Sequence, residues 1–387
     1  MYINISQNIN NVERVNYKII DFLYDICIEY DDINDSVSYT GNLATNYSYQ
    51  DSCNYLITKY NLLISTLIDN YIRIDPEVLR IYIENNISSD GFGIIPSDFD
   101  KQINASFFDN FYENENIVDC SSFEYFTNIS GSFISKNGPF YNCTNLKRII
   151  LPNPIKEFSK SWDGGKGIFQ GCTSLEYCKI TNNTVTNLGH FTFSGCTNPD
   201  LKIDLKNVPI STFGKNCLAS TRFKSLETLF LNYDFNNLES LGYCAMAYNT
   251  GLESFRLYSN INYIGTAQFA QCINLTSFTV DENGVDVRFN GATVYGPSGA
   301  IFYQTNISRI DFYSRITKME NLVFGNITTE LIFRNETPPD CSVGTSAIFR
   351  HFNGKIYVPD DKIDIYKAAG GFSTVASKIY GISELQS

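Results

Sequence analysis

The sequence predicts an α+β fold: a small, mainly helical amino-terminal region is followed by a solenoid of stacked coils with a parallel β-face and short helices or turns. Three observations predict it. One apolar pattern recurs along about two-thirds of the 387-residue chain, each copy ends in a strand-like run, and the first 75 residues instead carry apolar side chains at helical spacing. The chain therefore divides into regions with different periodicities.

The recurring pattern places a Cys three residues after a Phe and a Leu three residues later. FAQCINLTSFTV, residues 269 to 280, is one of four clear copies, and three weaker copies share its apolar positions. The copies begin at Phe140, Phe169, Phe193, Leu218, Met246, Phe269 and Phe302. Successive starts lie 23 to 33 residues apart, which is the period of a leucine-rich repeat.

Each copy closes with an L-x-x-L-x-L pattern, such as Leu275, Phe278 and Val280. Residues two apart on a strand face the same side, so we expect Phe278 and Val280 in the core and Thr276, Ser277 and Thr279 outside. Burying about four apolar side chains gains roughly 6–12 kcal/mol. Ordering some twenty-five residues costs about 1–2 kcal/mol each, so the coils must stack to fold.

These residues resemble the leucine-rich repeats of the BspA-like family, whose unit reads F-x-x-C-x-x-L-x-x-I-x-[IL]-P followed by I-G-x-x-A-F. The likeness is closest at LKRIILP (146 to 152) and IGTAQF (264 to 269), and it covers residues 117 to 387. The resemblance implies repeats over 117–365 and a carboxy-terminal cap over 366–387, with Tyr366 to Ala369 starting a short capping helix. The pattern weakens at Asn198 to Lys206 and across Asp281 to Ala300, where we expect distorted repeats.

The resemblance also implies a function. Such solenoids are recognition and adhesion modules of gut bacteria, some protozoa and phages, and catalysis is not expected of them. Because fold alone does not establish function, this implication is an analogy.

The first 75 residues predict an acidic helical region that attaches the protein to other proteins of an assembly or caps the first repeat. Helices are predicted over 12–33 and 55–74, joined by a polar linker over 34–54. Residues 1–130 carry 6 Lys plus Arg against 20 Asp plus Glu, whereas the rest of the chain is nearly neutral. This acidity argues against nucleic-acid binding, which needs clustered cations.

Residues 76–116 predict a linker with a turn that resembles a degenerate calcium loop. Aligning Gly93 with the glycine of such a loop puts Ser88, Asp90 and Phe92 at the first ligand positions. Phe92 cannot ligate calcium, which takes six to eight oxygens, so we expect no metal there.

The eleven cysteines include four at the same repeat position, Cys143, Cys172, Cys196 and Cys272. We expect them as reduced, buried thiols in one column, because no C-x-x-C pair indicates zinc or a local disulfide. With no signal-like start and no eighteen-residue apolar run, we expect synthesis in the cytoplasm and no membrane span. The lack of a signal-like start fits a phage virion component that leaves the cell by lysis. A cell-surface location is the alternative.

Catalytic constellations are sparse. His190 and His351 are the only histidines, which excludes a multi-His metal site, and no cofactor motif is present. Carboxylates are plentiful, but no pair is singled out. We expect no catalytic residues, no metal site and no cofactor.

Binding is expected on the open side of the repeat strands, at positions between the buried ones. The candidate binding residues are Lys147, Arg148, Glu176, Tyr177, Lys179, Glu227, Phe230, Glu253 and Arg256. This mixed polar surface with a few aromatics suits a protein or surface-glycan receptor, and solvated strand surface is the alternative.

The sequence thus favours a non-enzymatic structural and recognition protein, most simply a phage tail or fibre component. A leucine-rich-repeat adhesin on the surface of a gut bacterium is the main alternative, and a carbohydrate-active enzyme is the third.

Overall fold

A computed structural model describes residues 26–31, 36–41, 103–104, 111–126, 129–130, 138–152, 165–292, 299–325, 327–343 and 347–385. The chain forms two compact units, residues 1–102 with 125–128, and residues 103–124 with 129–387. Each unit is described by itself.

In the first unit, the described residues form an antiparallel hairpin of β1, Ile26–Asp31, and β2, Ser36–Gly41, with Ile28 opposite Tyr39. The helix predicted over 12–33 is therefore wrong at 26–31, and the predicted linker contains a strand. ICIEYD alternates apolar and polar residues at Ile28, Glu29, Tyr30 and Asp31, and this period of two favours a strand. The rest of 1–75, the helix predicted over 55–74 and the calcium-like turn lie outside the described residues.

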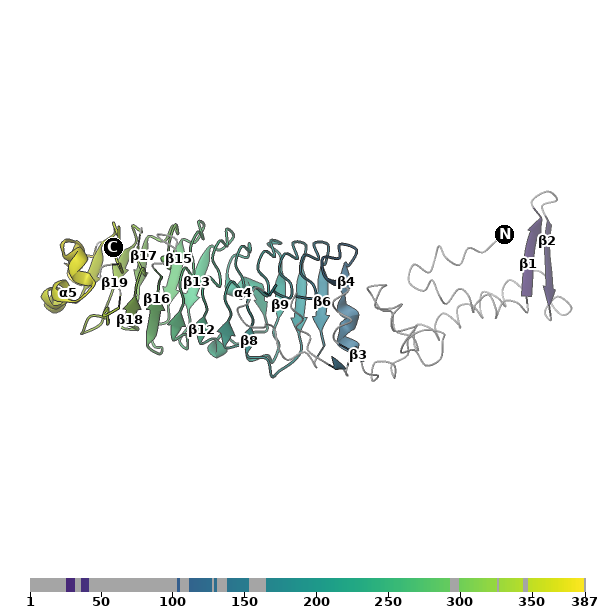
Figure 1. Cartoon of the computed structure of the whole chain (residues 1–387), viewed down its shortest axis with the longest axis horizontal. Helices are drawn as coiled ribbons and strands as arrows, with labels where there is room; N and C mark the ends of the chain where they lie inside the picture. The colour runs from purple at the N-terminus through teal and green to yellow at the C-terminus, as the bar shows by residue number, and fades with distance from the viewer. Residues whose placement is uncertain are drawn as a thin grey trace. The chain divides into compact units, whose positions relative to one another are not determined.

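The second unit is a solenoid of parallel strands, which confirms the fold class. Its first series of strands comes from the L-x-x-L-x-L runs and forms three parallel sheets along the stack (Figure 1). Successive strands are β4 Asp119–Cys120, β6 Arg148–Leu151, β7 Tyr177–Ile180, β9 Lys202–Asp204, β11 Phe230–Leu231, β13 Ser254–Leu257, β15 Ser277–Val280, β17 Arg309–Asp311, β19 Glu330–Ile332, β20 Ile356–Val358 and β21 Ile379–Gly381. The register pairs Ile149 with Cys178 and Leu151 with Ile180, as the repeat alignment predicts.

A second series of strands forms another parallel sheet of the same stack. It runs through β8 Asn187–Leu188, β10 Thr212–Phe213, β12 Ser240–Leu241, β14 Tyr263–Ile264, β16 Val287–Asn290 and β18 Ile316–Glu320. Two further short strands, β3 Ile103–Asn104 and β5 Ile129–Ser130, also pair in parallel. Glycine follows several of these strands because neighbouring coils approach closely. A Cβ on Gly214 would lie 2.7 Å from the backbone of Gly189.

The turns that close the coils bury the Phe and Cys of the repeat in two ordered columns. Phe140 stacks on Phe169 at 5.6 Å between ring centroids, and Phe169 stacks on Phe193 at 5.2 Å. The thiol of Cys172 donates to the Phe140 carbonyl of the preceding coil at 3.0 Å, and the Cys272 thiol donates equivalently to Met246 at 3.2 Å. Burial raises the pKa of Cys272 to about 12. The prediction of buried, reduced thiols at the four repeat positions is confirmed.

The FAQCINLTSFTV copy follows its prediction except at Val280, which was expected in the core and is half-buried. Phe269, Cys272 and Leu275 are fully buried and Phe278 is 6% exposed, whereas Thr276, Ser277 and Thr279 are exposed. The stack begins earlier than the predicted residue 117, because the ring of Phe111 packs on Phe140 at 5.6 Å.

The first series is interrupted at a place that the repeat pattern does not mark. LETL folds into a helical turn, α4 Leu226–Leu229, and β11 does not pair with β13. By contrast, the expected distortion at 198–206 is wrong, because β9 pairs regularly with β7. Within 281–300 the expected distortion is confirmed. β16 joins the second series between β14 and β18 with a register shift between Val287 and Arg288, and β15 does not pair with β17. Apolar side chains at the usual slots hold these segments in the stack.

The carboxy-terminal cap contains more regular structure than the short helix predicted to start at 366–369. It consists of η7 Asp360–Lys362, α5 Ile363–Ala368, η8 Phe372–Lys378, β21 and η9 Ile382–Glu384. The helix thus begins three residues before Tyr366. The other short helical turns of the solenoid are η4 Ser121–Tyr125 and η5 Phe235–Asn237.

Candidate functional site

The outward side of the first series is the candidate recognition surface, called the open face below. Burial alternates along its strands, for example in β7, where Cys178 and Ile180 are buried and Tyr177 and Lys179 are half-buried. The outward positions carry charged side chains and tyrosines that contact one another across neighbouring coils. We define the open face by Lys147, Arg148, Glu176, Tyr177, Lys179, Asp204, Glu227, Glu253, Arg256, Tyr258, Asp281, Arg309, Asp311, Tyr313, Glu330 and Arg334.

The first cluster of the open face joins three successive strands. The guanidinium of Arg148 lies over the ring of Tyr177 at 4.3 Å from its centroid. The Tyr177 hydroxyl donates to Oδ2 of Asp204 at 3.1 Å, and Oδ1 of Asp204 accepts from Asn232 at 3.0 Å. Burial and the neighbouring Asp204 carboxylate raise the pKa of Tyr177. The hydroxyl therefore stays protonated as a donor at neutral pH.

The second cluster lies at the interruption of the sheet. Arg256 Nε donates to Oδ1 of Asp281 at 2.6 Å, and its guanidinium lies 5.2 Å from the ring centroid of Tyr258. The Tyr258 hydroxyl donates in turn to Glu227, which α4 presents. Burial, reinforced by this hydrogen bond, raises the pKa of Tyr258.

The third cluster lies toward the carboxy-terminal end. Arg334 binds Asp311 through two nitrogens at 2.6 and 2.9 Å, and its guanidinium lies 5.7 Å from the ring of Tyr313. Arg309 likewise uses two nitrogens on one oxygen of Glu330, at 2.7 and 2.9 Å. Charge-assisted pairs of this kind fix both side chains in place. Each of the three sheets in the first series therefore carries an Arg, a Tyr and a carboxylate in contact, although Tyr258 of the second cluster is only 5% exposed.

Most of the predicted site residues lie where the sequence placed them. Lys147 pairs with Glu176 at 3.5 Å, and Lys224 pairs with Glu253 at 3.1 Å, with every one of these side chains more than half exposed. Pairs this exposed contribute little stability, which leaves them available to a partner.

Phe230 is the exception, and its predicted outward position is wrong. It is 4% exposed and packs on Phe213 at 5.5 Å between centroids. The helical turn α4 shifts the chain, so that Phe230, and not Leu229, pairs with the inward residue Ile203. Glu227 is exposed, but on α4 instead of a strand.

Sequence reasoning missed the carboxylates and arginines that tie the clusters together. These are Asp204, Asp281, Arg309, Glu330 and Arg334, with Tyr258 beside them. Their signal is complementary charge at equivalent positions of successive coils, as in Arg309 opposite Glu330. The coils differ in length, so this signal emerges only once the register between them is known.

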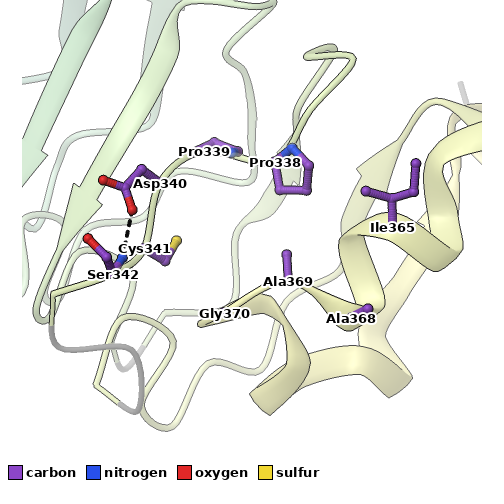
Figure 2. A pocket seen from close by; sticks show the side chains of 9 residues that line it. All are labelled: Pro338, Pro339, Asp340, Cys341, Ser342, Ile365, Ala368, Ala369 and Gly370. Carbon is purple, nitrogen blue, oxygen red and sulfur yellow. Dashed lines mark hydrogen bonds between the residues drawn. The ribbon is translucent and has the colours of Figure 1, made fainter.

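A separate pocket of about 660 Å³ lies between α5 of the cap and the loop at 338–342 that follows β19 (Figure 2). Pro338, Pro339 and Ile365 line it together with Asp340, whose Oδ1 accepts from the Ser342 backbone at 2.9 Å. Cys341 also lines the pocket, but it is 4% exposed and burial raises its pKa to about 12. A thiol of that pKa is not a nucleophile at neutral pH.

His190 has a structural role in the described fold. Its Nδ1 accepts from the backbone N–H of Lys215 at 2.9 Å, and burial lowers its pKa. Among the described residues, no group of three or more His, Cys, Asp or Glu side chains could hold a metal ion. Nor does any helix in the described ranges have the length and hydropathy to cross a membrane.

Comparison with known proteins places these coils in a family. No curated protein matches the chain. A crystal structure of a leucine-rich repeat protein from Bacteroides ovatus ATCC 8483 is similar, at 18% sequence identity and a TM-score of 0.39, over 70% of this chain and 68% of that chain. The BspA type leucine rich repeat region matches in 6 copies over residues 101–162, 163–290 and 236–331, more than half of the chain. This protein belongs to the BspA type leucine-rich repeat family.

Proposed function

We propose that this protein is a non-enzymatic recognition module that binds its partner on the open face. The observation that carries the proposal is the set of three Arg–Tyr–carboxylate clusters, each held in place by a contact between neighbouring coils. Tyr and Arg are enriched at binding hot spots, and side chains already held in position lose less entropy on binding. Other repeat proteins also bind their partners on extended faces of this kind.

The setting of this recognition is part of the proposal. The protein is then a phage tail or fibre component that contacts the host, or a cell-surface adhesin of a gut bacterium. Residues 1–75 attach the module to other proteins of the assembly. Mass spectrometry of purified phage particles and surface labelling of bacterial cells separate the two settings. Absence from purified particles, together with labelling at the cell surface, contradicts the phage setting.

The binding role is tested with fluorescently labelled full-length protein and intact cells of a panel of gut bacteria. The double variant Arg256→Ala/Arg334→Ala should bind at least about tenfold more weakly than wild type, because it removes the cation from two clusters. Arg288→Ala is the matched control, since Arg288 makes a similar bidentate pair with Glu320, both bonds at 2.8 Å, on the second series of strands. Equal binding by the double variant and wild type would refute the role of the open face.

A further inference from the structure

We infer that the partner of the open face is a neutral, hydroxyl-rich polysaccharide that runs along the stack. The inference rests on the proposed function and names the chemical class of the ligand. It depends on the way the charges of the open face are paired.

The arginines of the second and third clusters are already matched by carboxylates. Arg256 pairs with Asp281 at 2.6 Å, and Arg334 pairs with Asp311 at 2.6 Å. The carboxylates are the less exposed partners, with side-chain exposures of 21% and 23% against 54% and 44% for the two arginines. A face of such matched pairs has little net field to attract a polyanion.

A matched pair is, however, well suited to a hydroxyl group. A hydroxyl both donates and accepts, so one sugar hydroxyl can donate to Asp311 while it accepts from Arg334, and the adjacent Tyr313 offers ring surface and a further hydroxyl. The same Arg–carboxylate pair recurs at Arg256 and Asp281. The ring of Tyr258 beside it is 5% exposed and stacks on Phe235, so there the pair alone meets the sugar. The protein thus presents donor and acceptor side by side in a geometry that is fixed before binding.

The face lacks what a protein partner would need at its centre. Protein interfaces are anchored by a contiguous apolar patch that becomes a dry core, and the tyrosines of the open face are instead separated by charged side chains. The described large apolar residues that are exposed are Val118, Tyr248, Ile273, Val285, Val343 and Ile365. None belongs to the three clusters, and Tyr248 and Ile273 lie in turns. Strands of the stack repeat every ~4.8 Å, so an extended polymer can reach successive clusters.

The experiment treats intact cells of the bacterial panel before labelled full-length protein is added. Periodate cleaves the vicinal diols of glycans, and protease removes surface proteins. We expect periodate to abolish the binding that depends on Arg256 and Arg334 and protease to leave it intact. Binding should also persist in about 1 M NaCl, where the Debye length is about 3 Å, and Arg288→Ala should behave as wild type throughout.

Two outcomes overturn the inference while the proposed function stands. One is binding that protease abolishes and periodate spares, which indicates a protein partner. The other is binding that high salt abolishes, which indicates a polyanion. If wild type and the double variant bind equally before any treatment, the proposed function itself fails, and the two failures remain distinct.

Discussion

At the scale of single residues, Arg315 holds several backbone segments together, although the repeat pattern does not single it out. It is 2% exposed, and its five N–H groups are shared among six backbone carbonyls at 3.0–3.2 Å from the guanidinium nitrogens. The acceptors are Leu257, Tyr258, Ser259, Ile261, Asp281 and Val285. Burial lowers the pKa of Arg315 from its ordinary value, which reflects the desolvation that these carbonyls offset. One side chain thus fixes the loop between β13 and β14 and the start of the 281–300 segment.

We predict that Arg315→Met lowers the free energy of unfolding by at least about 3 kcal/mol, because each buried acceptor left without a donor costs about 1–3 kcal/mol. Urea unfolding followed by tyrosine fluorescence measures the change. The exposed Arg350 supplies a control, and Arg350→Met should change stability by no more than about 0.5 kcal/mol. A loss below about 1 kcal/mol in Arg315→Met would show that water replaces the guanidinium without penalty.

His190 predicts a dependence of stability on pH. Burial, aided by the charge of Lys215, holds the pKa of His190 in the folded protein below its ordinary value of 6.5. The unfolded chain therefore binds a proton more readily than the folded one as pH falls. The stability that the folded protein gains while His190 is neutral is fully present above about pH 6.5, and it is lost as pH falls through the folded pKa of His190.

The measurement compares wild type with His190→Asn, whose side-chain oxygen can still accept from the Lys215 N–H. Between pH 7 and pH 5, the free energy of unfolding should fall more steeply for wild type than for the variant. Parallel curves would mean that His190 titrates alike in both states. The comparison cancels the contributions of all other titratable groups, which both proteins share.

At the scale of elements, α4 interrupts the first series because its sequence supports a helix as well as a strand. Leu226 and Leu229 are three apart, a spacing that the L-x-x-L-x-L strand pattern and one helical turn both satisfy. Ser225 decides between them by capping. Its hydroxyl accepts from the Thr228 N–H at 3.3 Å, and the Thr228 hydroxyl accepts from the Ser225 N–H at 3.1 Å. This reciprocal capping box stabilises the helical turn.

Ser225→Ala should therefore destabilise the protein by about 1 kcal/mol, the usual cost of removing an N-cap side chain. Ser277→Ala, an exposed serine on β15, is the comparison and should be nearly neutral. Chemical denaturation of the two variants checks the difference. If both are neutral, the packing of the buried leucines alone holds the helical turn.

Whether a segment satisfies one pattern or both the helix and the strand pattern explains which elements the sequence predicts correctly. The Phe and Cys slots and the strands at 148–151, 177–180 and 277–280 follow from the repeat, because each coil must bury the same positions. ICIEYD satisfies both a helical and an alternating pattern, and its pairing with SVSYTG decides for a strand. Phe230 was misplaced for a related reason, since α4 changes the register by one residue and a one-residue change reverses the side that faces the core.

The paired charges of the open face lay beyond sequence reasoning for a different reason. Arg256 and Asp281 lie 25 residues apart, and Arg334 and Asp311 lie 23 residues apart. The number of residues per repeat varies, so the sequence separation does not tell which residues of neighbouring coils lie within reach of each other. Only the hydrogen-bonded register between coils fixes which residues meet. The sequence could therefore predict the face, but not the contacts that give it its chemistry.

At the scale of the whole molecule, the core of the solenoid is a continuous stack that the cap closes. Phe302 stacks on Phe324 at 5.8 Å and Phe324 stacks on Phe349 at 5.7 Å. Phe372 of the cap then packs on Phe349 and on Tyr366 of α5, each at 5.1 Å, and is fully buried. An exposed solenoid end would leave this core and the edge of β20 uncovered.

We predict that Phe372→Ala lowers the free energy of unfolding of the carboxy-terminal coils by about 3–5 kcal/mol, the usual cost of truncating a buried Phe. Each coil contacts only its neighbours, so the loss should decline with distance from the cap. Amide hydrogen exchange should therefore speed up most in β20 and β21 and least in β7 and β9. Ile365→Ala on the same cap is the control, because Ile365 is 51% exposed. Equal acceleration in all strands would show instead that the coils unfold as one cooperative unit.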